Sequence, residues 1–206
     1  MMETPSLGAL KPLLILVIGL PGSGKSFFAR QFSEEYKFFY IDNGRYEGEL
    51  EGLGLDSKKS STLAGNLANA TFEEALKSFK HIVWEGPFNS VRERETIFKK
   101  AKEAGFENLL VWVQTDTETA AERALNRDRR RQDDKNSLSL SDAEFKEQMV
   151  SFQKPDPAKE PLVVVSGKHD FKSQGLIVLK KIASMYVKKV SGEGAEALDK
   201  SRKIIR

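Results

Sequence analysis

The chain has 206 residues, of which 31% are charged and 39% are apolar, and its formal net charge is +3. This balance predicts a globular domain with a sizeable core, and no apolar run approaches the ~20 residues of a membrane-spanning helix. The weak positive charge does not by itself indicate nucleic acid, and the absence of cysteine excludes disulfides and favours a cytoplasmic protein.

The first predicted element is a strand over Leu13–Ile18, six consecutive apolar residues that come after a loose, flexible lead-in at residues 1–11. Such a run suits a strand that is buried on both faces. Residues 19–26 then read GLPGSGKS, an unbroken match to G-x-x-x-x-G-K-[ST], and an amphipathic helix is predicted from about Gly24 to Tyr36. A strand, a glycine-rich loop and a helix in this order are the context of a phosphate-binding loop.

This loop predicts a nucleotide site for direct physical reasons. Its glycines let successive backbone N–H groups turn inward, and the positive end of the helix dipole adds to their attraction for phosphate oxygens. We expect Lys25 to reach the β- and γ-phosphates of ATP and the Ser26 hydroxyl to ligate Mg²⁺. The predicted nucleotide-binding residues are Gly19, Pro21, Gly22, Ser23, Gly24, Lys25 and Ser26.

Four more strands are predicted downstream, with helices between them. Glycines weaken any helix in the mixed segment 45–61. Ser/Thr-x-x-Glu capping boxes predict helices that begin at Thr71, Ser90 and Ser141, and an arginine-rich helix is predicted from Thr117 to about Arg131. The last helix is predicted over 172–190. The strands are predicted at residues 37–42, 81–85, 109–114 and 161–166.

Strands that alternate with helices predict a doubly wound α/β fold, in which a parallel sheet carries helices on both faces. Ligands of such sheets lie beyond the carboxyl ends of the strands. Asp42 ends the second predicted strand, where a carboxylate can accept the proton of an attacking hydroxyl, and Arg45 can hold an anionic group of the acceptor. The alternative is that Asp42 only caps a helix and Arg45 is a surface charge.

Glu85 ends the third predicted strand, where an acidic residue can bind Mg²⁺ through water; a solvated strand-end carboxylate is the alternative. Arg127 and Arg130 or Arg131 lie on a helix before a polar stretch, an arrangement typical of a lid that closes on the transferred phosphoryl group. The alternative is a solvated helix with charge pairs. For Arg94, near the start of a helix, a solvated charge is the expectation.

Several of these features together resemble the P-loop kinases of the polynucleotide kinase and zeta-toxin type, and small ATP-binding kinases of the AAA family look similar. The resemblance spans about residues 13–186. It rests on GLPGSGKS, on Asp-x-x-Arg at 42–45, on Glu85 followed by Arg92, on the R-x-x-x-R spacing of the arginines and on F-x-x-P at 152–155.

The resemblance implies a P-loop NTPase fold whose five-stranded parallel sheet has the order 2-3-1-4-5. It implies Lys25 and Ser26 on ATP and Mg²⁺, Asp42 as the base and Arg45 on the acceptor. It also implies Arg127 with Arg130 or Arg131 as lid residues. The chain departs from the family in having Glu85 where Asp is common, and residues 46–70, which should line the acceptor pocket, match nothing.

The sequence therefore predicts one P-loop kinase domain over 12–190, with a lid at about 123–152 and a flexible tail at 191–206. Its predicted function is transfer of the γ-phosphate of ATP to a hydroxyl of a small molecule or of a nucleic-acid 5′ end. A small acceptor is favoured, because the arginines alternate with acids and no aromatic platform accompanies them. The alternative is an ATPase or ATP-binding switch without a hydroxyl acceptor. The oligomeric state stays open.

Overall fold

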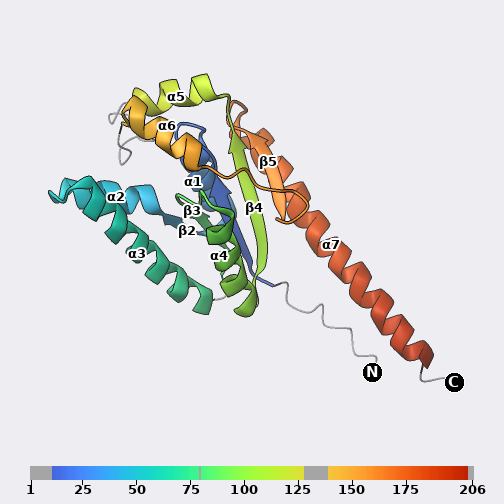
Figure 1. The fold of residues 1–206 in the computed structure, drawn as a ribbon. Helices are drawn as coiled ribbons and strands as arrows, with labels where there is room; N and C mark the ends of the chain where they lie inside the picture. The colour runs from blue at the N-terminus through green and yellow to red at the C-terminus, as the bar shows by residue number, and fades with distance from the viewer. Residues whose placement is uncertain (1–10, 79, 128–138, 204–206) are drawn as a thin grey trace.

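The computed structural model describes residues 11–78, 80–127 and 139–203, and its centre is a five-stranded sheet (Figure 1). All strand pairs are parallel, and the strand order is β2-β3-β1-β4-β5. This confirms the predicted doubly wound α/β fold and the strand order that the resemblance implies. The strands are β1 Leu13–Ile18, β2 Phe39–Asp42, β3 Ile82–Glu85, β4 Glu107–Gln114 and β5 Leu162–Ser166.

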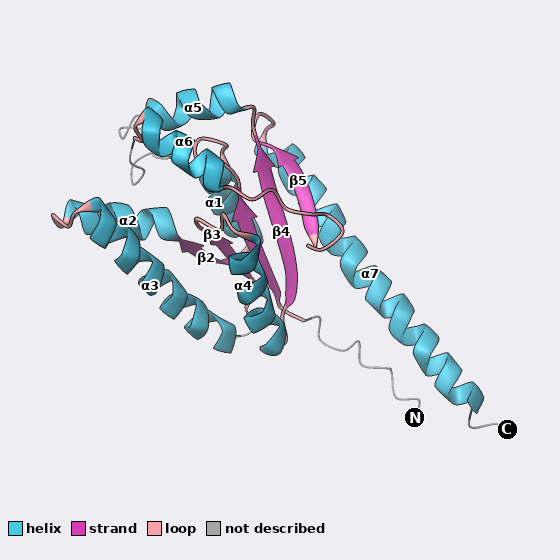
Figure 2. Cartoon of the chain, in the orientation of Figure 1, coloured by secondary structure: helices cyan, strands magenta, loops and turns pink. Residues whose placement is uncertain are grey.

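Helices cover both faces of this sheet (Figure 2). Apolar side chains of α3 and α4 pack with one face, and those of α1 and α7 pack with the other. The helices are α1 Lys25–Tyr36, α2 Asn43–Gly52, α3 Ser57–Lys77, α4 Val91–Glu103, α5 Thr117–Leu125, α6 Asp142–Ser151 and α7 Phe171–Lys203. No helix in the described ranges is both long enough and apolar enough to cross a membrane.

The central strand β1 places the phosphate-binding loop in the middle of the carboxyl edge of the sheet. All six of its residues are buried, which agrees with its apolar sequence. β1 pairs with β3 on one side and with β4 on the other, so the loop after Ile18 has strand ends on both sides. The β2–β3 register puts Asp42 directly opposite Glu85.

The segment that the sequence leaves mixed, residues 45–61, forms α2 and the start of α3. Side chains of Asp42 and Asp56 cap these helices by accepting hydrogen bonds from the backbone N–H groups of Arg45 and Lys59, both at 3.0 Å. The predicted helix start at Thr71 is wrong, because Thr71 lies inside α3 and its hydroxyl donates to the carbonyl of Leu67. Caps and packing between α2 and α3 outweigh the glycine cost.

The other two predicted capping boxes are confirmed, at Ser90 before α4 and at Ser141 before α6. Two helix ends differ from the prediction. α5 ends at Leu125 with Asn126 as its C-cap, short of the predicted end near Arg131. α7 continues to Lys203, past the predicted end near residue 190.

Candidate active site

The phosphate-binding loop fits so closely against α5 that a side chain at Gly22 has no room. Gly22 has a φ of 76°, a left-handed conformation that L-residues rarely adopt, and a Cβ there would lie 2.0 Å from the carbonyl oxygen of Ala120. Gly24, also left-handed with a φ of 95°, is the N-cap of α1. The glycines of the motif therefore serve both the curvature of the loop and its contact with the helix above it.

The ends of β4 and β5 hold the same loop from the other side. The Thr115 hydroxyl donates a 2.9 Å hydrogen bond to the carbonyl oxygen of Ser23. A Cβ on Gly167 would lie only 1.9 Å from that oxygen, so the turn after β5 touches the loop directly. Thr115 is a residue that sequence reasoning missed, since a threonine after a strand carries no distinctive signal.

Lys25, Ser26 and Glu85 meet at the carboxyl end of β3. The Lys25 Nζ lies 3.7 Å from Glu85 Oε1, and the Ser26 hydroxyl donates to the same oxygen at 3.2 Å. Burial lowers the pKa of Lys25, and Glu85 opposes that shift. Burial also raises the pKa of Glu85, with Lys25 opposing and the nearby Asp42 adding to the increase. The residues predicted for phosphate and metal thus form one buried, mutually compensating group.

Asp42 joins this group while also capping α2. Its Oδ1 accepts a 3.0 Å hydrogen bond from the backbone N–H of Arg45. The side chain therefore does cap the helix, as the alternative interpretation of Asp42 expected. The carboxylate is also near enough to act on Lys25 and Glu85. The Arg45 guanidinium pairs with Glu49 on the same helix at 3.4 Å and lies 5.5 Å from the Tyr46 ring centre.

Only part of the predicted arginine lid can be placed. Arg127 is close enough to Lys25 to lower the pKa of its ammonium group. Arg123 donates to the carbonyl oxygen of Gly167 at 3.3 Å, next to the phosphate-binding loop. Arg130 and Arg131 lie outside the described residues. In the described part of the predicted lid, α5 packs against α6 through a small apolar cluster of Ala120, Ala124 and Phe145.

Arg94 does not have the predicted solvated position; it is completely buried. Its guanidinium donates two hydrogen bonds to Glu160, at 2.7 and 3.1 Å, and others to the carbonyl oxygens of Phe88 and Gln153. The prediction failed because Glu160 lies 66 residues further along the chain, and no local pattern links the two. This pair ties the turn after β3 to the segment after α6.

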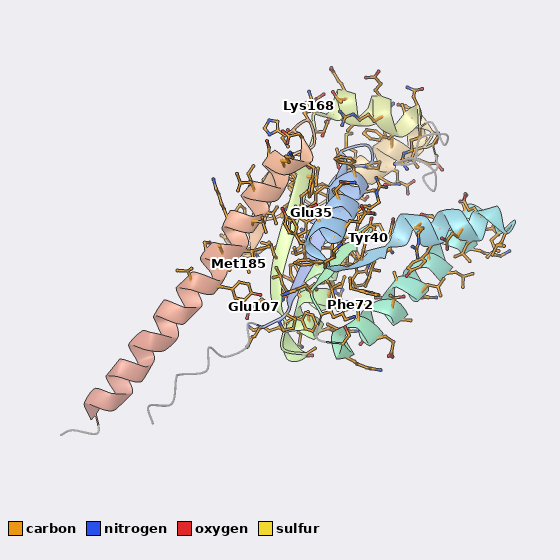
Figure 3. All side chains as sticks on the ribbon, turned by 180° about the vertical axis from the view of Figure 1, so that it is seen from behind. Glu35, Tyr40, Phe72, Glu107, Lys168 and Met185 are labelled. Atoms are coloured by element: carbon orange, nitrogen blue, oxygen red, sulfur yellow. The ribbon has the colours of Figure 1, made fainter. Side chains whose placement is uncertain are left out.

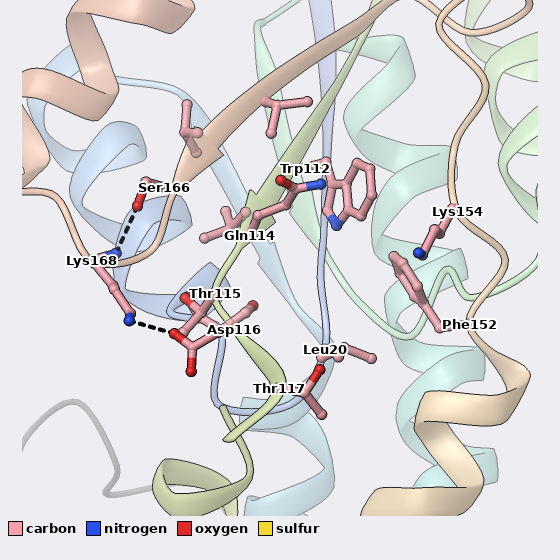
Figure 4. A pocket seen from close by; sticks show the side chains of 14 residues that line it. Leu20, Trp112, Gln114, Thr115, Asp116, Thr117, Phe152, Lys154, Ser166 and Lys168 are labelled. Carbon is pink, nitrogen blue, oxygen red and sulfur yellow. Dashed lines mark hydrogen bonds and ion pairs between the residues drawn. The ribbon is translucent and has the colours of Figure 1, made fainter. Parts of the chain in front are cut away.

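A cavity of about 540 Å³ opens beside the loop at the carboxyl ends of β4 and β5 (Figure 4). Trp112 and Phe152 form its aromatic side, with ring centres 6.0 Å apart, and Lys168 pairs with Asp116 at its rim. Asp42 and Glu85 end β2 and β3, on the opposite side of β1 in the strand order. The loop thus lies between this cavity and the carboxylate pair.

The residues present fit a magnesium ion that is shared with phosphates. Ser26 and Glu85 offer two oxygen ligands side by side, and Glu85 Oε2 is buried with no hydrogen-bond partner among the described residues. Mg²⁺ is usually held by one or two protein groups together with substrate phosphates. The described ranges contain no cluster of three or more His, Cys, Asp or Glu side chains that could hold a metal ion.

Comparisons with known proteins agree with this geometry. A family model described as an AAA domain matches residues 14–155. Kti12 from Chaetomium thermophilum in complex with ADP-AlF3 is similar in structure, with a TM-score of 0.60 and 20% identity over 83% of this chain and 97% of that chain. A comparison with curated protein sequences finds no match.

Two bacterial kinases have the same fold. The gluconokinase from Sinorhizobium meliloti gives a TM-score of 0.57 and 15% identity, covering 88% of this chain and 98% of its own. The shikimate kinase from Aquifex aeolicus gives 0.53 and 18%, covering 84% and 98%. At these identities the likeness establishes the fold alone.

Proposed function

The chain belongs to this AAA-domain family, and we propose that it is an ATP-dependent kinase that transfers the γ-phosphate of ATP to a hydroxyl acceptor. The observation that carries the proposal is the meeting of Lys25, Ser26, Glu85 and Asp42 at the phosphate-binding loop. A cation, a hydroxyl and two carboxylates at this place are what phosphoryl transfer needs, since positioning and charge stabilisation supply most of its catalysis.

In the proposed reaction the loop N–H groups hold the phosphates, and Lys25 leaves Glu85 to bind the β- and γ-phosphate oxygens. The 3.7 Å pair with Glu85 favours the charged form of Lys25 and so opposes burial, which lowers the pKa of this ammonium group. Ser26 and Glu85 would hold Mg²⁺, which neutralises phosphate charge when it is bound. On ATP binding, the Lys25–Glu85 ion pair would thus be replaced by an interaction of Lys25 with the phosphates and one of Glu85 with Mg²⁺.

Asp42 is the proposed general base. The acceptor hydroxyl gives its proton to the Asp42 carboxylate as its oxygen bonds to the γ-phosphorus, and the bond from that phosphorus to the β–γ bridging oxygen breaks to release ADP. One carboxylate oxygen, Oδ1, accepts the Arg45 N–H at 3.0 Å, and we assign the acceptor hydroxyl to the other oxygen. A capping role and a catalytic role are therefore compatible in one side chain.

We place the nucleoside of ATP towards the β4–β5 side and the acceptor towards α2. Arg127, with Arg130, would close over the phosphates as lid residues within about 123–152. The acceptor side is mixed in charge: Arg45 is paired with Glu49, and burial raises the pKa of Glu47 on the same helix. These features favour a small acceptor, for a cytoplasmic enzyme of the polynucleotide kinase and zeta-toxin type, over a nucleic-acid strand.

The proposal is tested with γ-labelled ATP, Mg²⁺ and a panel of 5′-hydroxyl oligonucleotides, nucleosides, sugars, aminoglycosides and nucleotide-sugars. Label on one acceptor class that depends on Lys25 would establish the kinase and name its substrate, with Lys25→Ala as the blank. Release of free phosphate alone, unchanged in Asp42→Asn, would refute transfer to a hydroxyl and leave an ATPase switch.

A further inference from the structure

Tyr40 is a largely buried phenol that the proposed reaction does not use. It lies on β2 beside α1, two residues before Asp42 (Figure 3). Side chains two residues apart on a strand point to the same face, so the tyrosine and the proposed base share one side of the sheet. Sequence analysis passed over Tyr40 as an aromatic strand residue, although the alternation of β2 was the signal that could have singled it out.

The Tyr40 hydroxyl is shut off from solvent and makes no geometrically complete hydrogen bond among the described residues, although the Asp42 carboxylate lies close enough to interact with it. Burying a donor without a partner is unfavourable, and such groups in folded proteins commonly serve a second state or a ligand. The charged groups that face this hydroxyl are the carboxylates of Asp42 and Glu85 and the guanidinium of Arg30 from α1. Burial raises the pKa of the phenol, and both carboxylates add to that effect, so the group is a donor at any working pH.

Of the three, Asp42 is the partner that the backbone favours. Asp42 shares its strand and face with Tyr40. Glu85 lies on the neighbouring strand, its Oε1 is engaged by Ser26 and Lys25, and its Oε2 is the oxygen left for the proposed Mg²⁺. The Arg45 N–H donates to Asp42 Oδ1 at 3.0 Å, which fixes that oxygen but leaves the carboxylate able to turn about its χ2 torsion. A second donor would hold the plane of the carboxylate.

We propose that Tyr40 is a positioning residue whose hydroxyl donates a hydrogen bond to the Asp42 carboxylate when the acceptor is bound. With Arg45 N–H and Tyr40 O–H as donors, Asp42 keeps one oxygen lone pair aimed at the acceptor hydroxyl. The inference rests on the proposed function, since it supports Asp42 as the base. It assigns to Tyr40 no contact with ATP, and its effect is therefore on the transfer step.

The experiment measures label transfer, the KM for ATP and thermal stability for the wild type and for Tyr40→Phe, which removes only the hydroxyl. We expect kcat for transfer to fall about 10- to 100-fold, the usual worth of a hydrogen bond to a charged group. The KM for ATP should not change, because the hydroxyl has no contact with ATP in this proposal. The melting temperature should change little, because the deleted oxygen makes no complete hydrogen bond within the described part of the chain. Tyr186→Phe is the matched control, since it removes the same atom from a tyrosine that bonds to the carbonyl of Lys11.

A double variant separates positioning from a merely structural role. In the Asp42→Asn background, Tyr40→Phe should cause little further loss, because the group that it positions is already gone. The inference would be overturned if Tyr40→Phe lowered kcat by the same factor in the Asp42→Asn background as in the wild type. It would also be overturned if Tyr40→Phe left kcat unchanged, whether or not the melting temperature fell. Failure of the proposed function can be told apart from failure of this inference, because the wild type would then transfer label to no acceptor. In that case the inference would be wrong as well.

Discussion

The contact between Gly167 and the phosphate-binding loop leads to a substitution whose effect can be worked out from the structure. In Gly167→Ala the new Cβ would lie 1.9 Å from the carbonyl oxygen of Ser23 and 2.3 Å from Thr115 Oγ1. Real Cβ contacts are essentially never under 3.0 Å, so the loop and the β5 turn must separate by about 1 Å. The Ser23 carbonyl belongs to the backbone and cannot turn aside as a side chain can, and the Thr115–Ser23 hydrogen bond would be lost in the process.

The cost has two parts. Overpacking of this kind costs about 1–3 kcal/mol, and a lost hydrogen bond that leaves a buried carbonyl unpaired costs about another 1–3 kcal/mol. We therefore expect the free energy of unfolding to fall by about 2–6 kcal/mol. The affinity for ADP should fall at least about tenfold, because the loop N–H groups are displaced from the positions that hold phosphates.

Urea denaturation and ADP titration calorimetry measure the two effects. Gly175→Ala in α7 is the matched control, because the nearest atom to its Cβ would be the Tyr36 hydroxyl at 3.5 Å, an ordinary contact. That variant should raise the free energy of unfolding by about 0.5–1 kcal/mol through helix propensity and leave ADP binding unchanged. If Gly167→Ala were as stable as the wild type and bound ADP equally well, the claim that the turn after β5 holds the phosphate-binding loop in place would be refuted.

Three further predictions concern the buried pair, the metal and the acceptor. Arg94→Ala should lower the free energy of unfolding by about 3–5 kcal/mol in urea titrations, since it leaves Glu160 buried without its cation, while replacing both partners with methionine should cost far less. Glu85→Gln should raise the Mg²⁺ concentration for half-maximal transfer by about 10–100-fold; an unchanged Mg²⁺ dependence would remove Glu85 from the metal site. Arg45→Ala should raise the KM for an anionic acceptor but not the KM for ATP. Glu49→Ala, which releases the Arg45 guanidinium from its pair, should lower the KM for that acceptor. If neither variant changed the KM for the acceptor, Arg45 would be only a surface charge.

The sheet and the phosphate-binding loop were predictable because their signals are local. The apolar run of β1 defines a central strand with the bounds Leu13–Ile18 that the structure has, and the GLPGSGKS motif directly after it specifies the turn into α1. The capping boxes at Ser90 and Ser141 are equally local, since donor and acceptor lie three residues apart. The neighbouring positions of Asp42 and Glu85 were predictable because parallel strands end at one edge of the sheet.

The parts that escaped prediction depend on contacts between distant segments. Arg94 is buried because Glu160 and the carbonyl of Gln153 come to meet it. Thr71 has the sequence of a helix start, but packing by Ala68 and Phe72 carries α3 through it. The burial of the Tyr40 hydroxyl is likewise a property of the packed protein. Local patterns thus located the strand ends, while tertiary contacts decide which side chains are held there.

The central claim is that phosphate leaves ATP for a hydroxyl with Asp42 as the base, and one measurement tests it most directly. Under single-turnover conditions with γ-labelled ATP and the acceptor class that the panel identifies, the label on the acceptor is compared with the label released as free phosphate. The account predicts that nearly all label reaches the acceptor in the wild type. It also predicts that Asp42→Asn slows that transfer about 10²- to 10⁴-fold while ATP still binds. Label that appears only as free phosphate, at equal rates in both proteins, would contradict it.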